Sequence, residues 1–299
     1  MMMTKAHSIE CREAPVNPDG QVSLWRKVMR GLAEAPPTGL LGLVVLFAYL
    51  FVIIFAPWLA PFGEAAVVSD VYEPWGGQYL LGTDSLGRDI YSRIIYAARN
   101  TVGITLLSTV LAFVIGAGLG MIAAVMGGWT DQVLSRLVDM LMAIPLLIFA
   151  LLLLMVFGSS VTALVLILGC LESTRVFRLT RAVAMNVSVM DYVEAARLRG
   201  ENLFWIVRRE ILPNILAPLF AEFGLRFCFI FLLISSLSFL GLGLHPPTAD
   251  WGAMVRENAM LITFGRMTPL LPAVAIAVLT IAVNLVVDWF THKASGLSK

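Results

Sequence analysis

The feature that most constrains this chain is a series of apolar runs, each of a length that can cross a lipid bilayer. A membrane-spanning helix needs about 20 consecutive apolar residues, and the first run reads "GLLGLVVLFAYLFVIIFAPWLA". The six runs are Gly39–Ala60, Thr101–Met126, Leu137–Gly158, Val161–Val176, Ile215–Leu242 and Leu270–Phe290. Of the 299 residues, 59% are hydrophobic and only 14% are charged. The sequence therefore predicts an all-α integral membrane protein with six transmembrane helices.

The distribution of basic residues predicts the orientation of these spans, because cytoplasmic segments are enriched in Lys and Arg. The polar leader, residues 1–38, carries five basic residues, whereas the loop of residues 61–100 carries three arginines against five acidic residues. Six arginines lie between the fourth and fifth spans, and the tail, residues 291–299, adds two lysines. Both termini are therefore expected in the cytoplasm, on either side of a six-span domain at residues 39–290.

The largest cytoplasmic loop, about residues 178–213, is predicted to hold two short helices. Asp191 can cap the first helix, with Glu194 as the acidic partner of a capping box. Gly200 can end that helix in a left-handed conformation. The second helix can follow at once and should stop at Pro213, which has no N–H to continue the ladder. From these residues alone, an amphipathic pair lying on the inner leaflet remains an alternative.

Several kinds of site are missing from the sequence. No GxxxxGK[ST] phosphate loop is present, so the chain is not expected to hydrolyse ATP. The three cysteines and three histidines show no spacing typical of a disulfide framework or a metal site. A net charge of +1 argues against a nucleic-acid partner, which would need a basic excess. Transport driven by another chain or by an ion gradient therefore becomes the leading expectation, ahead of a membrane-embedded enzyme.

Ionisable residues within or near the spans leave an ion-coupled secondary transporter open as a second function class. The candidates are Asp139, Glu172, Glu222, Arg226 and Asp288. Three of them lie near predicted span ends, where water or headgroups can reach them. Glu222 and Arg226 are four residues apart on the fifth span, which suits an ion pair on one helix face.

The motif "EAARLRG" at Glu194–Gly200, followed at a fixed distance by Leu-Pro, resembles the EAA loop of permease subunits of bacterial ATP-binding-cassette (ABC) importers. The usual form of that loop has an isoleucine where Glu210 stands here. The resemblance implies that the loop docks as a coupling helix on a cytoplasmic ATPase subunit. The coupling residues that it implies are Glu194, Ala195, Ala196, Gly200, Leu212 and Pro213.

Three further motifs resemble the smaller permease of dipeptide and oligopeptide importers. They read "LGTDSLGRDIYSRIIYAAR", "RLVDMLMAIPLLIFAL" and "SLSFLGLGLHPPTADWGAM", in that order along the chain. The C-terminal segment "VVDWFTHKASG" departs from the usual Gly-Asp-Gly-Leu-Arg-Asp ending and retains only Asp288 of it. Dipeptides, oligopeptides, nickel chelates, glutathione and certain sugars therefore all stay open as substrates.

The resemblance also implies a fold, a location and partners. We expect the type I ABC importer permease fold in the bacterial inner membrane. A second, homologous permease subunit would complete the translocation pathway, and a periplasmic or lipid-anchored solute-binding protein would deliver the substrate. ATP and Mg would bind to two cytoplasmic ATPase subunits, so this chain is expected to have no cofactor or metal of its own and to contact membrane lipids.

The remaining candidate residues belong to the outer segments and the path. In "LGTDSLGRD", Gly82 and Gly87 are expected to make tight turns, because no complete calcium-loop spacing is present. The segment "HPPTADWGAMVREN" is expected to form a short outer helix carrying a tryptophan, for docking or for anchoring at the headgroup level. The docking or gating candidates are Asp84, Arg88, Asp89 and Trp251, and the path candidates are Glu222, Arg226, Ser235 and Ser236.

Overall fold

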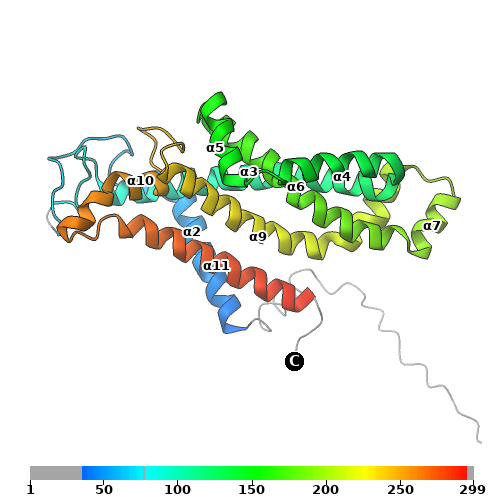
Figure 1. The fold of residues 1–299 in the computed structure, drawn as a ribbon. Helices are drawn as coiled ribbons and strands as arrows, with labels where there is room; N and C mark the ends of the chain where they lie inside the picture. The colour runs from blue at the N-terminus through cyan, green and yellow to red at the C-terminus, as the bar shows by residue number, and fades with distance from the viewer. Residues whose placement is uncertain (1–35, 77, 295–299) are drawn as a thin grey trace, which may run out of the picture. The chain divides into compact units, whose positions relative to one another are not determined.

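A computed structural model describes residues 36–76 and 78–294, and the regular structure of these residues is helical (Figure 1). The long helices are α2 (Pro37–Leu59), α3 (Ile90–Met126), α4 (Gly128–Met142), α5 (Leu146–Phe157), α6 (Val161–Ser188), α9 (Leu212–Phe239) and α11 (Leu270–Ala294). Three short helices, α7 (Asp191–Leu198), α8 (Leu203–Ile206) and α10 (Trp251–Asn258), lie in the connections. The predicted leader lies outside the described residues apart from its last three.

Four helical segments of the described chain are long and apolar enough to cross a membrane: α2, α3, Leu203–Phe239 and α11. The pair α4 and α5 qualifies only as one broken span. Helix α6, the fourth predicted span, is 28 residues long, but its charged residues lower its hydropathy; they are Glu172, Arg175, Arg178 and Arg181. The all-α membrane fold is thus present, while the count of six spans stays a prediction.

The third predicted span is broken, so the expectation of one helix over Leu137–Gly158 was wrong. Helix α4 ends at Met142, α5 begins at Leu146, and the two axes meet at 87°. Pro145 explains the break, because proline has no N–H and disfavours a helical conformation in the residue before it. With only 12 residues, α5 is about 18 Å long, shorter than the hydrocarbon core.

Two other helices extend beyond the apolar windows that predicted them. Helix α3 begins at Ile90, because the Asp89 carboxylate accepts a hydrogen bond from the Ser92 N–H at 2.9 Å and caps the helix. Helix α6 continues to Ser188, well past the predicted end at Val176. Hydropathy marks the apolar part of a helix, whereas capping and packing decide where the helix ends.

Small residues allow the helices to pack closely, as is common in membrane proteins. A Cβ atom on Gly116 of α3 would lie 2.4 Å from the carbonyl oxygen of Ser173 in α6. A Cβ atom on Gly42 of α2 would lie 2.8 Å from the carbonyl oxygen of Ala282 in α11. The helices place the segment of residues 60–89 and α10 at one end and α7 at the other (Figure 1). The predicted orientation makes these the outer and the cytoplasmic ends.

Candidate functional site

Helix α7 lies within the loop predicted to be cytoplasmic, about residues 178–213, and the C-terminus of α7 forms as predicted. Gly200 has a φ of +80°, which a residue with a side chain rarely adopts. The N–H of Gly200 donates to the carbonyl of Arg197 at 3.0 Å, and the N–H of Glu201 donates to the carbonyl of Ala196 at 3.2 Å. This pair of bonds is a Schellman motif, which satisfies the last carbonyls of the helix.

The N-terminus of α7 differs from the prediction. Met190 is the N-cap residue and makes no side-chain capping bond, while Asp191 is the first residue of the helix. The predicted capping box is therefore absent. Asp191 and Glu194 instead place two carboxylates in the first turn, where their negative charges interact favourably with the positive end of the helix dipole.

The coupling residues implied by the EAA motif lie on two sides of the loop. Val193 and Ala196 are fully buried against the ends of the long helices. Glu194, Ala195 and Gly200 are exposed, and Leu198 is 83% exposed. The first short helix thus packs against the long helices by one face, and its other face is exposed.

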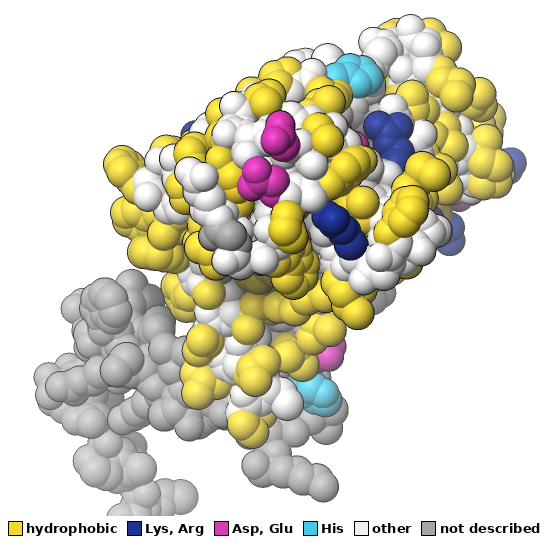
Figure 2. All heavy atoms as spheres, turned by 90° about the vertical axis from the view of Figure 1, so that its left-hand side faces the viewer, with side chains coloured by type: hydrophobic (Ala, Val, Ile, Leu, Met, Phe, Trp, Pro, Cys, Tyr) yellow, Lys and Arg dark blue, Asp and Glu magenta, His cyan; other side chains and the backbone are white. Residues whose placement is uncertain are grey.

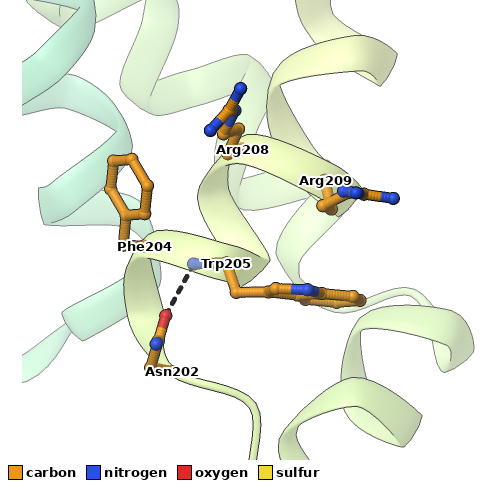
Figure 3. A pocket seen from close by; sticks show the side chains of 5 residues that line it. All are labelled: Asn202, Phe204, Trp205, Arg208 and Arg209. Carbon is orange, nitrogen blue, oxygen red and sulfur yellow. Dashed lines mark hydrogen bonds between the residues drawn. The ribbon is translucent and has the colours of Figure 1, made fainter.

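The second short helix does not stop at Pro213, so that prediction was wrong. Asn202 caps it by accepting a hydrogen bond from the Trp205 N–H at 2.8 Å (Figure 3). The chain then forms a π-helical turn at Val207–Ile211 and continues directly into α9. The N–H of Leu212 donates to the carbonyl of Val207, five residues earlier. The backbone hydrogen bonds are therefore shifted by one residue just before Pro213. The missing N–H of proline is tolerated near the start of the next α-helical stretch.

A cavity of about 250 Å³ adjoins this turn, and no pattern in the sequence predicted it. Figure 3 shows Phe204 and Arg208 on one side of the helical turn and Trp205 and Arg209 on the other. The guanidinium of Arg199 lies 5.9 Å from the centroid of the Trp205 ring, within cation–π range. The arginines and aromatic residues that line this cavity are adjacent in the sequence, but the π-helical turn that brings them around one cavity is not evident from it.

At the outer end, Asp84 is the centre of a buried charge cluster. Its carboxylate lies 2.7 Å from Nε of Arg88 and also accepts a hydrogen bond from Nη1 of Arg93. Glu257 of α10 pairs with Arg88 at 3.1 Å and with Arg93 at 2.9 Å. The cluster joins the outer loop, α3 and α10. Arg93 and Glu257 were not among the predicted site residues, because their contact links positions far apart in the chain.

The pKa of Asp84 reflects competing effects. Burial alone would raise this pKa, but hydrogen bonds from the backbone N–H groups of Arg88 and Leu86, together with the charges of Arg93 and Arg88, lower it below its usual value. The carboxylate therefore stays ionised.

The outer loop has the tight turns that the sequence predicts. Gly82 and Gly87 have φ angles of +76° and +71°, and a Cβ atom on Gly87 would lie 2.1 Å from the carbonyl oxygen of Ser69. Asp84, Arg88 and Asp89 are all buried. Their side chains shape the loop and do not face a partner in this conformation.

Trp251 begins the predicted short outer helix α10, but its side chain is only 1% exposed. It packs edge-on against Tyr49 and Phe231, with ring centroids 6.0 Å apart in each pair. Its Nε1–H donates to the carbonyl of Ile94 at 3.1 Å. In this conformation the indole neither meets a docking protein nor anchors at the headgroup level; it holds α10 against α3, α2 and α9.

Exposed apolar side chains instead cover much of the outer end (Figure 2). Val67, Leu80, Met260 and Phe264 are each more than two-thirds exposed. Apolar surface of this kind marks an interaction site when it is contiguous. The outer end therefore presents these apolar side chains, while Asp84, Arg88 and Asp89 of the loop are buried and Asp70 is exposed.

In the middle of the helices, Glu222 and Arg226 form the ion pair that the sequence predicts. Oε1 of Glu222 and Nε of Arg226 are 2.6 Å apart. Nη1 of Arg226 also donates to Glu172 of α6 at 3.2 Å. The pair therefore joins α9 to α6.

The two path candidates nearer the outer end lie beside a cavity. Ser235 and Ser236 help to line a cavity of about 420 Å³, together with residues of α10 and α11. Their hydroxyl groups donate to the carbonyls of Phe231 and Leu232 within α9. Among residues 36–76 and 78–294, no group of His, Cys, Asp or Glu side chains has the arrangement of a metal site.

Comparisons with known proteins agree with this architecture. Residues 116–293 match the family described as "Binding-protein-dependent transport system inner membrane component". The chain is 34% identical over 254 residues to the di/tripeptide transport system permease protein DppC of Pseudomonas aeruginosa, covering 83% of this chain and 84% of that protein. It is 32% identical over 282 residues to the dipeptide transport system permease protein DppC of Haemophilus influenzae, covering 92% and 93%.

A solved structure shares the fold. The crystal structure of an amino acid ABC transporter with histidines matches with a TM-score of 0.51 and 21% identity, over 68% of this chain and 94% of that one. The family match covers more than half of the chain. The chain therefore belongs to the binding-protein-dependent transport system inner membrane components, as a multi-pass permease subunit of the ABC type.

Proposed function

We propose that this permease subunit imports dipeptides, tripeptides or similar small solutes by ATP-driven alternating access. The names of its relatives from Pseudomonas aeruginosa and Haemophilus influenzae support the substrate class. The observation that carries the mechanism is the geometry of the cytoplasmic loop, in which α7 is anchored by a buried face and ends at the left-handed Gly200. The ion-coupled alternative receives no support from these relatives.

The energy source in this proposal is a pair of ATPase subunits that bind ATP and Mg. The exposed side chains of Glu194, Ala195 and Leu198 would enter a groove of one ATPase, while Gly200 fixes the direction in which the loop leaves α7. Leu212 and Pro213 mark the point where the loop joins α9. Movement of the ATPase would then move α9, and this chain would have no catalytic role.

The remaining partners are a second, homologous permease subunit and a periplasmic or lipid-anchored binding protein. We place the docking surface on the exposed apolar residues of the outer end, with the buried Asp84, Arg88, Asp89 and Trp251 supporting that surface from within. The path would run along the face of α9 that carries Glu222, Arg226, Ser235 and Ser236.

The test is reconstitution of the complete transporter in liposomes. The purified chain alone should show no ATPase activity, and hydrolysis and peptide uptake should appear when both ATPases, the second permease and the binding protein are present. Transporters with a Lys→Ala change in the phosphate loop of each ATPase are the control for contaminating activity. Turnover by the isolated chain above this control, or complete transporters that hydrolyse ATP but import no di- or tripeptide, would refute the proposal.

A further inference from the structure

Arg175 of α6 is a charged residue to which the proposed function assigns no role. It lies midway along the 28-residue α6, and Arg226 lies midway along the 28-residue α9. At a rise of 1.5 Å per residue, each is about 20 Å from either end of its helix. The hydrocarbon core is about 30 Å thick, and Arg226 lies within the predicted fifth span, Ile215–Leu242. The hydrogen bond from Arg226 to Glu172 brings the neighbouring Arg175 to the same level, so both guanidinium groups are expected at membrane depth although the apolar part of α6 ends near Val176.

Four charges meet at this level. Glu172 lies between the two arginines, 3.9 Å from Nε of Arg175 and 3.2 Å from Nη1 of Arg226. Glu222 pairs with Arg226 from the other side. Two acidic and two basic residues balance, so the cluster carries no net charge.

The two signs are not equally exposed. The side chain of Glu172 is 1% exposed and that of Glu222 is 15% exposed, whereas that of Arg175 is 46% exposed. The side chain of Arg226 is 11% exposed, so Arg175 is the one strongly exposed charge of the cluster, and the surface that the cluster presents there is cationic. Apart from the ion pair with Glu172 at 3.9 Å, the Arg175 guanidinium has no hydrogen-bond partner within residues 36–76 and 78–294, so its donors are open to a ligand.

An exposed guanidinium in the middle of a membrane helix is costly in contact with lipid and is found facing water or another subunit. The exposed face of α6 at Arg175 is therefore an aqueous or subunit-facing surface. On the adjoining α9, Arg226 lies over the Phe229 ring at 4.7 Å, and its side chain is 11% exposed.

We infer that Arg175, backed by the cluster of Glu172, Arg226 and Glu222, lines the translocation path and binds a carboxylate of the passing peptide. This inference rests on the proposed function. A planar guanidinium with free donors pairs with a carboxylate through two parallel hydrogen bonds. Glu172 neutralises the site when it is empty, and the wide 3.9 Å separation leaves Arg175 available for a passing ligand. Acidic cargo should therefore pass more readily than basic cargo at this point.

The first experiment measures uptake of alanyl-glutamate and alanyl-lysine by the complete reconstituted transporter. The binding protein is the same in every sample, so its own preference cancels when variants are compared with the wild type. Arg175→Gln should lower the ratio of acidic to basic dipeptide uptake about tenfold, the size expected for a hydrogen bond to a charged group. Arg175→Lys should keep most of the wild-type ratio.

Arg99→Gln is the matched control, because Arg99 is an exposed arginine near the outer end of α3. It removes the same charge away from the cluster and should leave the ratio unchanged. An unchanged ratio in Arg175→Gln, in transporters whose wild type imports both dipeptides, would overturn this inference and leave the proposed function intact. Failure of the wild type to import either dipeptide would instead count against the proposed function.

The second experiment tests access from water. Arg175→Cys is introduced into a chain whose Cys11, Cys170 and Cys228 have been replaced by alanine, and the assembled transporter is treated in membranes with charged methanethiosulfonates. The ethylammonium reagent should react and restore the uptake ratio, whereas the ethylsulfonate reagent should lower it further. No reaction with either reagent would show that Arg175 is sealed against the second permease subunit, and would overturn its place in the path.

Discussion

Replacing Gly200 with valine tests whether the backbone conformation of the loop, independently of its side-chain contacts, is needed for ATPase binding. At a φ of +80°, a residue with a Cβ atom is strained by about 1–2 kcal/mol. The space around the position is open, because a Cβ atom there would meet no atom within 4 Å. The cost therefore comes from the backbone alone. It should lower the population of the docking-competent loop about five- to thirtyfold.

The variant should still insert normally, since the long helices do not depend on this turn. The assay titrates purified ATPase onto the permease pair and measures both the bound fraction and peptide uptake. We expect weaker ATPase binding and a parallel loss of uptake for Gly200→Val. Gly200→Asn is the control, because asparagine adopts the left-handed region more readily. Wild-type ATPase affinity and undiminished uptake in Gly200→Val would show that the loop conformation does not hold the ATPases.

Two further predictions concern packing and charge. Gly116→Leu should push α3 and α6 apart and lower the amount of assembled subunit in membranes, whereas Gly118→Leu, whose Cβ atom meets open space, should not; equal amounts by immunoblotting would contradict this. Asp84→Asn should remove the negative charge that pairs with the two buried arginines and lower the free energy of unfolding by about 3–5 kcal/mol. This loss would be measured as a lower melting temperature of the purified transporter. Because the pKa of Asp84 is lowered in the folded protein, the stabilising charge is fully present above the unfolded pKa of about 4 and is lost only as the pH falls through the lower folded pKa. The effect of Asp84→Asn should therefore be the same at pH 7 and pH 5.

Local signals in the sequence predicted the features that depend on few neighbours. The apolar runs identified a membrane protein, the loop sequence identified a short helix that ends before Gly200, and Gly200 adopts the left-handed conformation that its position suggested. The ion pair of Glu222 and Arg226 follows from their spacing on one helix. Each of these features is set by residues within one or two helical turns.

The errors arose where hydrogen bonding or distant contacts decide the outcome. Hydropathy predicted one span across Pro145, but the missing N–H of this proline breaks the helix within an otherwise apolar run. The prediction that the helix ends at Pro213 was wrong, because the preceding π turn shifts the backbone hydrogen bonds and the helix continues into α9. The burial of Trp251 depends on rings from α2 and α9. The pairing of Arg93 with Glu257 joins positions 164 residues apart, which a single sequence does not reveal.

The π turn has a mechanical consequence. Because it links α8 to α9 without a break, Leu203–Phe239 is one helical segment of 37 residues, about 55 Å long, which Pro218 does not interrupt. By contrast, the connection from α6 to α7 passes through non-helical residues at positions 189 and 190. The loop is thus hinged on one side and rigidly fixed on the other. A tilt applied at its cytoplasmic end would be carried along a single rod to the charges at mid-membrane and to the serines beyond them.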